Sequence, residues 1–129
     1  MEMTKTATAD GGTALTLTLT AVETEMLGDD AAHAVAELAR GLWAAADLRR
    51  GTSRDEWWPV VLDTSRLLRR LEGIRDAALR ESPTASHGEI AAALGEPRTT
   101  VASRRQKGTL PPAVATTWES WARTGDLPA

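Results

Sequence analysis

Hydrophobic and polar residues alternate strictly from Thr13 to Ala21, where leucines occupy every second position and threonines stand between them. Because successive side chains of a strand point to opposite faces, this pattern predicts a β-strand with Leu15, Leu17 and Leu19 on one face. A single strand leaves its backbone groups unpaired, and the rest of the chain offers little extended sequence. We therefore expect the Leu15–Leu19 strand to pair with the same strand of a second copy.

Helical periodicity follows this strand. Thr20 and Glu23 have the spacing of a capping box, and a helix is predicted from about Asp29 to Arg50, ending before Gly51. Its apolar positions recur every three or four residues and form one stripe, which we expect to be buried. The stripe consists of Val35, Leu38, Leu42 and Ala46.

A long helix is predicted next, with a start signal at Ser53 and Glu56 and with Pro59 tolerated in its first turn. Its apolar residues have near-heptad spacing, at Trp57, Val61, Leu67, Leu68, Leu71, Ile74 and Ala78. Such a seam packs either on the preceding helix or on the same helix of a second copy. Packing within the chain is the more frequent outcome, and we expect it here.

Two short helices are predicted after a break at Ser82–Thr84, because Ser86 and Glu89 form another capping box. Ile90 and Leu94 lie one turn apart, Gly95 allows the positive φ of a sharp corner, and Pro97 suits the opening of a second helix. Ala91 is small enough for close crossing, and Val101 fills the wedge between the helices. This is the pattern of a helix-turn-helix.

The last predicted helix opens at Pro111 and Pro112 and stops at Gly125. Val114, Trp118 and Trp121 fall on one of its faces. An aromatic stripe at helical spacing is more often part of the core than a patch for a partner, so we expect the two tryptophans to be buried.

The segment 86–107 resembles the helix-turn-helix of region 4 of sigma factors and, more loosely, that of luminescence-type response regulators. The matching residues are Glu89, Ile90, Ala91, Leu94, Gly95, Pro97, Thr100, Val101, Ser103 and Arg104. Two positions depart from the wider helix-turn-helix pattern, Glu96 and Arg104, where apolar residues are common, although Arg104 matches the sigma-type variant. No core-binding domain precedes the motif, so the resemblance implies a DNA-binding unit rather than a sigma factor.

The net charge of −3 is unevenly distributed along the chain. Residues 1–65 hold five Lys/Arg and eleven Asp/Glu, residues 66–107 hold nine and five, and residues 108–129 hold one and two. The positive excess therefore coincides with the motif, where phosphates would be contacted. The alternative for the arginines between 66 and 80 is that they only solvate a helix face. Phe, Tyr and Cys are absent, which disfavours base-stacking surfaces and thiolate metal sites and leaves duplex DNA as the nucleic-acid partner.

If the second motif helix enters the major groove, its outward residues face base edges. The candidates for base contacts are Arg98, Thr99, Ala102, Ser103 and Gln106. Other side chains and the start of the first motif helix are better placed for the backbone of the DNA. The candidates for phosphate contacts are Ser86, His87, Thr100, Arg104, Arg105 and Lys107.

Two further interpretations are weaker. A strand before helices is similar to the ribbon-helix-helix repressors, but the outward residues of this strand are threonines in an acidic region, so a ribbon that only joins subunits is favoured. Asp29, His33 and Glu37 share a helix face, yet this spacing alone is poor evidence for a metal site. We expect no catalysis, no metal and no cofactor.

The sequence thus predicts a mainly α fold, a helical bundle with a helix-turn-helix and one strand paired across a dimer. Its expected regions are a disordered terminus (1–12), a strand and packing helices (13–62), the helix-turn-helix region (63–108) and a C-terminal helix (109–129). The expected function is a cytoplasmic transcription regulator, a repressor that binds double-stranded DNA as a homodimer through the Leu15–Leu19 strand and the long helix. The alternative is a non-catalytic adaptor for proteins, and no membrane segment or signal peptide is recognised.

Overall fold

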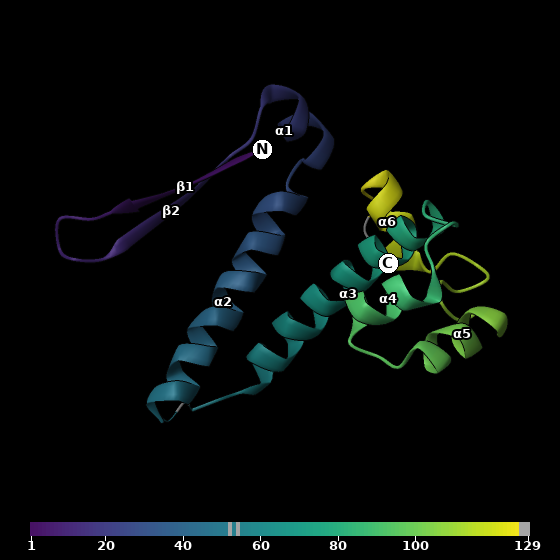
Figure 1. Ribbon diagram of the computed structural model, residues 1–129. Helices are drawn as coiled ribbons and strands as arrows, with labels where there is room; N and C mark the ends of the chain where they lie inside the picture. The colour runs from purple at the N-terminus through teal and green to yellow at the C-terminus, as the bar shows by residue number, and fades with distance from the viewer. Residues whose placement is uncertain (52, 54, 127–129) are drawn as a thin grey trace. The chain divides into compact units, whose positions relative to one another are not determined.

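The computed structural model describes residues 1–51, 53 and 55–126 of the chain, so the end of the expected C-terminal region, 127–129, lies outside the described residues. The fold is mainly helical with a two-stranded antiparallel sheet, and it divides into compact units at residues 1–33 and 34–129. In chain order the elements are β1 (Glu2–Ala7), β2 (Thr13–Thr18), α1 (Ala21–Leu27), α2 (Asp30–Arg50), α3 (Trp58–Arg80), α4 (His87–Leu94), α5 (Arg98–Gln106) and α6 (Thr117–Thr124) (Figure 1).

The first unit is built on a β-hairpin. β2 follows the alternating pattern as predicted, but it pairs within the chain, with Met3 of β1 opposite Leu17 and Lys5 opposite Leu15. The expectation of a disordered segment over residues 1–12 was wrong for Glu2–Ala7, which form β1. We expected no partner for β2 within the chain and therefore a strand paired across a dimer, but β1 is an intrachain partner. After the hairpin, Thr20 and Glu23 form the expected capping box at the start of α1.

In the second unit, α2 and α3 form an antiparallel helical hairpin. The Arg40 guanidinium donates to the Asp63 carboxylate at 2.6 Å, and Nε of Arg70 lies 3.3 Å from an oxygen of Glu37. Residues later in α2 therefore meet residues earlier in α3. Gly41 lies at this contact, since a Cβ built on it would be 3.6 Å from a methyl group of Thr64.

The apolar stripe expected to be buried on α2 is exposed instead, at Val35, Leu38, Leu42 and Ala46. The buried residues of α2 are Glu37 and Ala44 instead, because the charged pairs and the close approach at Gly41 determine which side of α2 faces α3. The apolar seam of α3 was likewise expected to pack within the chain. Among the described residues, most of this seam does not. Val61, Leu68, Leu71, Ile74 and Ala78 of this seam are exposed.

α3 begins at Trp58, so Pro59 lies in the first turn as expected, where its missing N–H breaks no helical hydrogen bond. The start signal at Ser53 and Glu56 was misplaced, because Trp57 is the residue that precedes the helix and it makes no side-chain cap.

α6 packs closely across the middle of α3. Gly73 allows this approach, since a Cβ built on it would lie 2.4 Å from the carbonyl oxygen of Trp118. Trp118 and Trp121 contact each other edge to face at 5.8 Å, and the Arg70 guanidinium lies 4.9 Å from the centre of the Trp121 ring. The two tryptophans are therefore part of the core as expected, whereas Val114 is exposed.

A buried carboxylate fixes α6 to the end of α3. Arg80 donates to both oxygens of Glu119, at 2.6 and 2.9 Å, and to the carbonyl of Pro112 at 2.6 Å. Hydrogen bonding from Arg80 lowers the pKa of the Glu119 carboxyl below its usual value, more than its burial raises it. Arg123 adds a bond of 2.8 Å to Glu81.

The C-terminal helix starts later than expected. Its first residue is Thr117, capped by the hydroxyl of Thr116, and not Pro111 or Pro112. The preceding segment is kept out of a helix because Leu110 inserts into the core beside α4 and α5. Among the described residues, no helix is both long enough and apolar enough to cross a bilayer.

Candidate nucleic-acid interface

α4 and α5 form a compact helical pair around one apolar cluster. Ile90 and Ala91 of α4, Val101 of α5 and Leu110 are buried together, with Val101 completely inaccessible to solvent. Partly buried residues from α3, α4 and the intervening loop complete the cluster, namely Leu79, Ala85 and Leu94. Because Val101 fixes one side of α5 against this core, the remaining sides of the helix are oriented as well.

The corner between the two helices has the backbone that the sequence predicted. Gly95 has a φ of 66°, in the left-handed region that glycine adopts without steric cost, and its N–H donates to the carbonyl of Ala91. Pro97 has the expected φ of −62°, but its ψ of 143° is extended, so it precedes α5 and the helix opens at Arg98 instead. The turn is therefore short, and α5 begins immediately after it.

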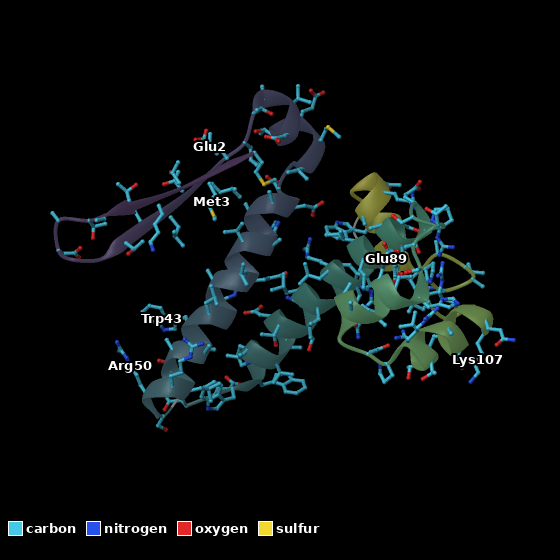
Figure 2. The ribbon with its side chains drawn as sticks, in the orientation of Figure 1. Glu2, Met3, Trp43, Arg50, Glu89 and Lys107 are labelled. Atoms are coloured by element: carbon cyan, nitrogen blue, oxygen red, sulfur yellow. The ribbon has the colours of Figure 1, made fainter. Side chains whose placement is uncertain are left out.

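The candidates for base contacts are partly on the open side of α5. Arg98, Thr99 and Gln106 are exposed, while Ala102 and Ser103 are half-buried. Thr100 and Lys107 are exposed too, and Figure 2 shows Lys107 pointing away from α4 at the far end of α5. The described residues contain no ion pair for Arg98 or Lys107. These two cations therefore stand at opposite ends of the helix with their charges available.

The start of α4 is less suited to an anion than the sequence indicated. The hydroxyl of Ser86 accepts a hydrogen bond from the N–H of Glu89, and the N–H of Ser86 donates to the Glu89 carboxylate at 2.7 Å. These bonds lower the pKa of Glu89, so the carboxylate stays charged beside the helix start. A phosphate near Ser86 and His87 would meet this negative charge.

Arg105 holds the pair together from inside. Its Nη1 donates to the carbonyl of Ala85 at 2.8 Å and lies 3.2 Å from Nδ1 of His87, and its Nη2 donates to the carbonyl of Pro83 at 3.4 Å. The guanidinium therefore ties α5 to the loop that precedes α4. Sequence reasoning assigned Arg105 to phosphate and missed this role, because no local pattern signals a contact between residues about twenty positions apart.

Arg104 pairs with Glu96 across the corner, its Nη1 lying 3.1 and 3.2 Å from the two carboxylate oxygens. These are the two positions at which the sequence departs from the wider helix-turn-helix pattern. In this chain the two side chains form an ion pair. The Arg104 charge is thus partly neutralised before it could meet a phosphate.

Among the residues that the structure describes, no group of three or more His, Asp or Glu side chains is arranged to hold a metal ion. Glu37, which the sequence placed on one face with Asp29 and His33, pairs with Arg70. Comparisons with models of protein families, with curated proteins and with solved structures found no significant match.

Proposed function

We propose that this protein regulates transcription by binding specific sequences of double-stranded DNA, with α4 and α5 as a helix-turn-helix and α5 as the helix that enters the major groove. One observation carries the proposal: α5 is held to the core by Val101 and exposes Arg98, Thr99 and Gln106 on its other sides. From Arg98 to Lys107 the chain has four basic residues and no acidic one.

The size of α5 suits this role. A helix with its side chains is about 10–12 Å in diameter, and the major groove of B-DNA is about 12 Å wide. Arg98 can donate two hydrogen bonds to a guanine edge, Gln106 can bond an adenine, and the methyl group of Thr99 can contact a thymine. Ala102 and Ser103, being half-buried, would contribute through close approach of the backbone.

Fewer residues are proposed to contact phosphates than the sequence alone indicated. Lys107 and Thr100 are exposed beside the proposed groove surface, whereas Arg104 and Arg105 have partners within the protein. A protein of this size bound across a promoter would exclude polymerase, so repression by occupancy is the proposed outcome.

The test begins with selection of bound duplexes from a random pool, because the recognised sequence is unknown. Binding of the selected duplex is then measured by fluorescence anisotropy at several salt concentrations. Arg98→Ala should weaken binding by about 1–3 kcal/mol and relax the preference at one base step. Lys107→Ala should weaken all sequences alike and reduce the log–log salt slope by about one.

Arg50→Ala is the matched control, since Arg50 is an exposed arginine at the end of α2 (Figure 2). It removes the same charge without altering α5, and it should leave both the preference and the salt slope unchanged. If no duplex is selected, or if Arg98→Ala and Arg50→Ala behave alike, the groove assignment is wrong.

A protein adaptor is the second candidate, and the overall charge of −3 favours it over a general polyanion binder. In that case the chain would co-purify with a protein partner and bind it without marked salt dependence. Loss of binding between 50 and 200 mM salt, by a factor on the order of 10³ or more if several phosphates are contacted, distinguishes the DNA-binding function.

A further inference from the structure

Large apolar residues lie on the outside of the α2–α3 hairpin. They include Val35, Leu38 and Leu42 on α2 and Val61, Leu68 and Leu71 on α3. Their spacings of three, four and seven residues are those of a heptad seam. Each is between 46% and 64% exposed, although apolar residues at such spacing normally lie against another helix.

The two stripes share one face of the hairpin. Leu38 directly follows Glu37, which contacts α3, and therefore lies about 100° further round α2. Leu71 directly follows Arg70, which contacts α2, and lies about 100° further round α3 in the same sense. In a pair of antiparallel helices, residues rotated by equal angles from the line along which the helices touch lie on the same side of the pair. Leu38 and Leu71 therefore lie on the same side of the hairpin, and the other stripe residues extend outward from them along each helix.

This surface is large for an isolated chain. If a fully exposed aliphatic side chain presents about 120 Å², the six residues together present on the order of 400 Å². A standard interface buries about 800 Å² per partner, of which about 60% is apolar. The six residues alone supply most of the apolar area that such an interface needs.

We propose that a second copy of this chain covers the surface, so that two α2–α3 hairpins form a four-helix bundle around a two-fold axis. In such a contact the same patch meets itself, so any charge within it would face a like charge or need a partner. The stripe residues are all uncharged. Their heptad spacing also matches the packing of helices in a four-helix bundle, where each side chain inserts between four of its neighbours.

The seam continues towards the helical pair. Ala78 stands seven residues after Leu71 and lines the shallow groove of about 280 Å³ between α3 and α4. A dimer along the seam would thus determine the separation of the two copies of α5. This last link rests on the proposed function, and in that case the recognised DNA has two inverted half-sites.

Sedimentation equilibrium of the full chain tests the proposal. The expected mass is twice the chain mass of 13.8 kDa, falling towards a single chain on dilution. Leu68→Glu places a charge in the seam and should raise the dimer dissociation constant by about 100-fold or more. Leu62→Glu is the matched control, because Leu62 is an exposed leucine of the same helix about 120° away from Leu68. It should change the constant by less than about threefold.

Circular dichroism is used to check that each variant keeps its helices. If Leu68→Glu does not fold, Leu38→Gln on α2 makes the same test without adding a charge. A chain that remains monomeric at about 100 µM overturns the proposal, as does equal dimerisation of wild type, Leu68→Glu and Leu38→Gln. A dimer that selects no duplex would refute the DNA-binding function and leave this inference standing, and a monomer that binds a single half-site would do the reverse.

Discussion

Gly73 determines how closely α6 can approach α3, and its replacement by alanine is the sharpest test of the packing. The added Cβ would lie 2.4 Å from the carbonyl oxygen, 2.5 Å from the carbonyl carbon of Trp118 and 3.0 Å from the backbone nitrogen of Glu119. All three atoms belong to backbone, so no side chain can rotate out of the way. The helices must move apart by about 1 Å to restore an ordinary contact.

Two effects of the substitution oppose each other. Alanine is favoured over glycine inside a helix by about 1 kcal/mol. Overpacking in a close contact costs about 1–3 kcal/mol and occasionally more. The obstacle here is rigid and the separated helices would also loosen the Arg80–Glu119 pair, so the upper part of that range applies. We expect the free energy of unfolding to fall by about 2 kcal/mol.

The assay is urea unfolding followed by tryptophan fluorescence and circular dichroism at one fixed protein concentration. Gly41→Ala is the matched control, because Gly41 is also inside a helix but its added Cβ would meet only a methyl group of Thr64 at 3.6 Å. That variant keeps the gain in helix propensity without the clash. It should raise the free energy of unfolding by up to about 1 kcal/mol.

The two variants should therefore shift stability in opposite directions. Equal stabilisation by Gly73→Ala and Gly41→Ala would mean that α6 does not cross α3 at Gly73. An unchanged tryptophan emission in a destabilised Gly73→Ala protein would also contradict the reasoning, since the backbone of Trp118 meets Gly73 and the Trp118 ring packs against Trp121.

The remaining expectations concern ion pairs. Because the pKa of Glu119 is lowered in the folded chain, its contribution to stability is present above the usual value of 4.5 and is lost as the pH falls through the folded pKa. Glu119→Gln should accordingly be less stable at pH 7 and lose less stability than wild type between about pH 5 and pH 3 in acid titrations followed by circular dichroism. At the corner of the helical pair, Glu96→Leu and Arg104→Leu should each cost about 0.5–1 kcal/mol, whereas the double variant, which has the apolar corner common in helix-turn-helix sequences, should recover wild-type stability. Additive losses in that double-mutant cycle, measured by urea unfolding, would show that Glu96 and Arg104 do not interact.

Local signals in the sequence predicted the helical pair well. The capping box at Ser86, the left-handed Gly95 and the buried Val101 each depend on residues only a few positions apart, so their geometry follows from the backbone itself. The departures at Glu96 and Arg104 were visible, but their pairing was not. Eight residues separate them across a corner, where helical spacing rules do not apply.

Tertiary contacts account for what the sequence did not reveal. The Asp10–Gly11 pair is a strong hairpin-turn signal and could have identified β1 as the partner of β2. By contrast, the periodicity of α2 gives the apolar side of a helix but not which neighbour covers it. The roles of Arg80 and Arg105 likewise depend on carbonyl and carboxylate groups that only the folded chain brings near.

Arg70 lies between a carboxylate on one side and two indole rings on the other. One guanidinium thereby serves as a shared partner for α2, through Glu37, and for α6, through Trp118 and Trp121. If either helix detached, the Arg70 guanidinium would lose one of its partners while still surrounded by protein. Detachment of α2 alone or of α6 alone therefore costs free energy. Amide hydrogens of α2 and α6 should consequently exchange with solvent in a single cooperative event, rather than as independently fraying segments.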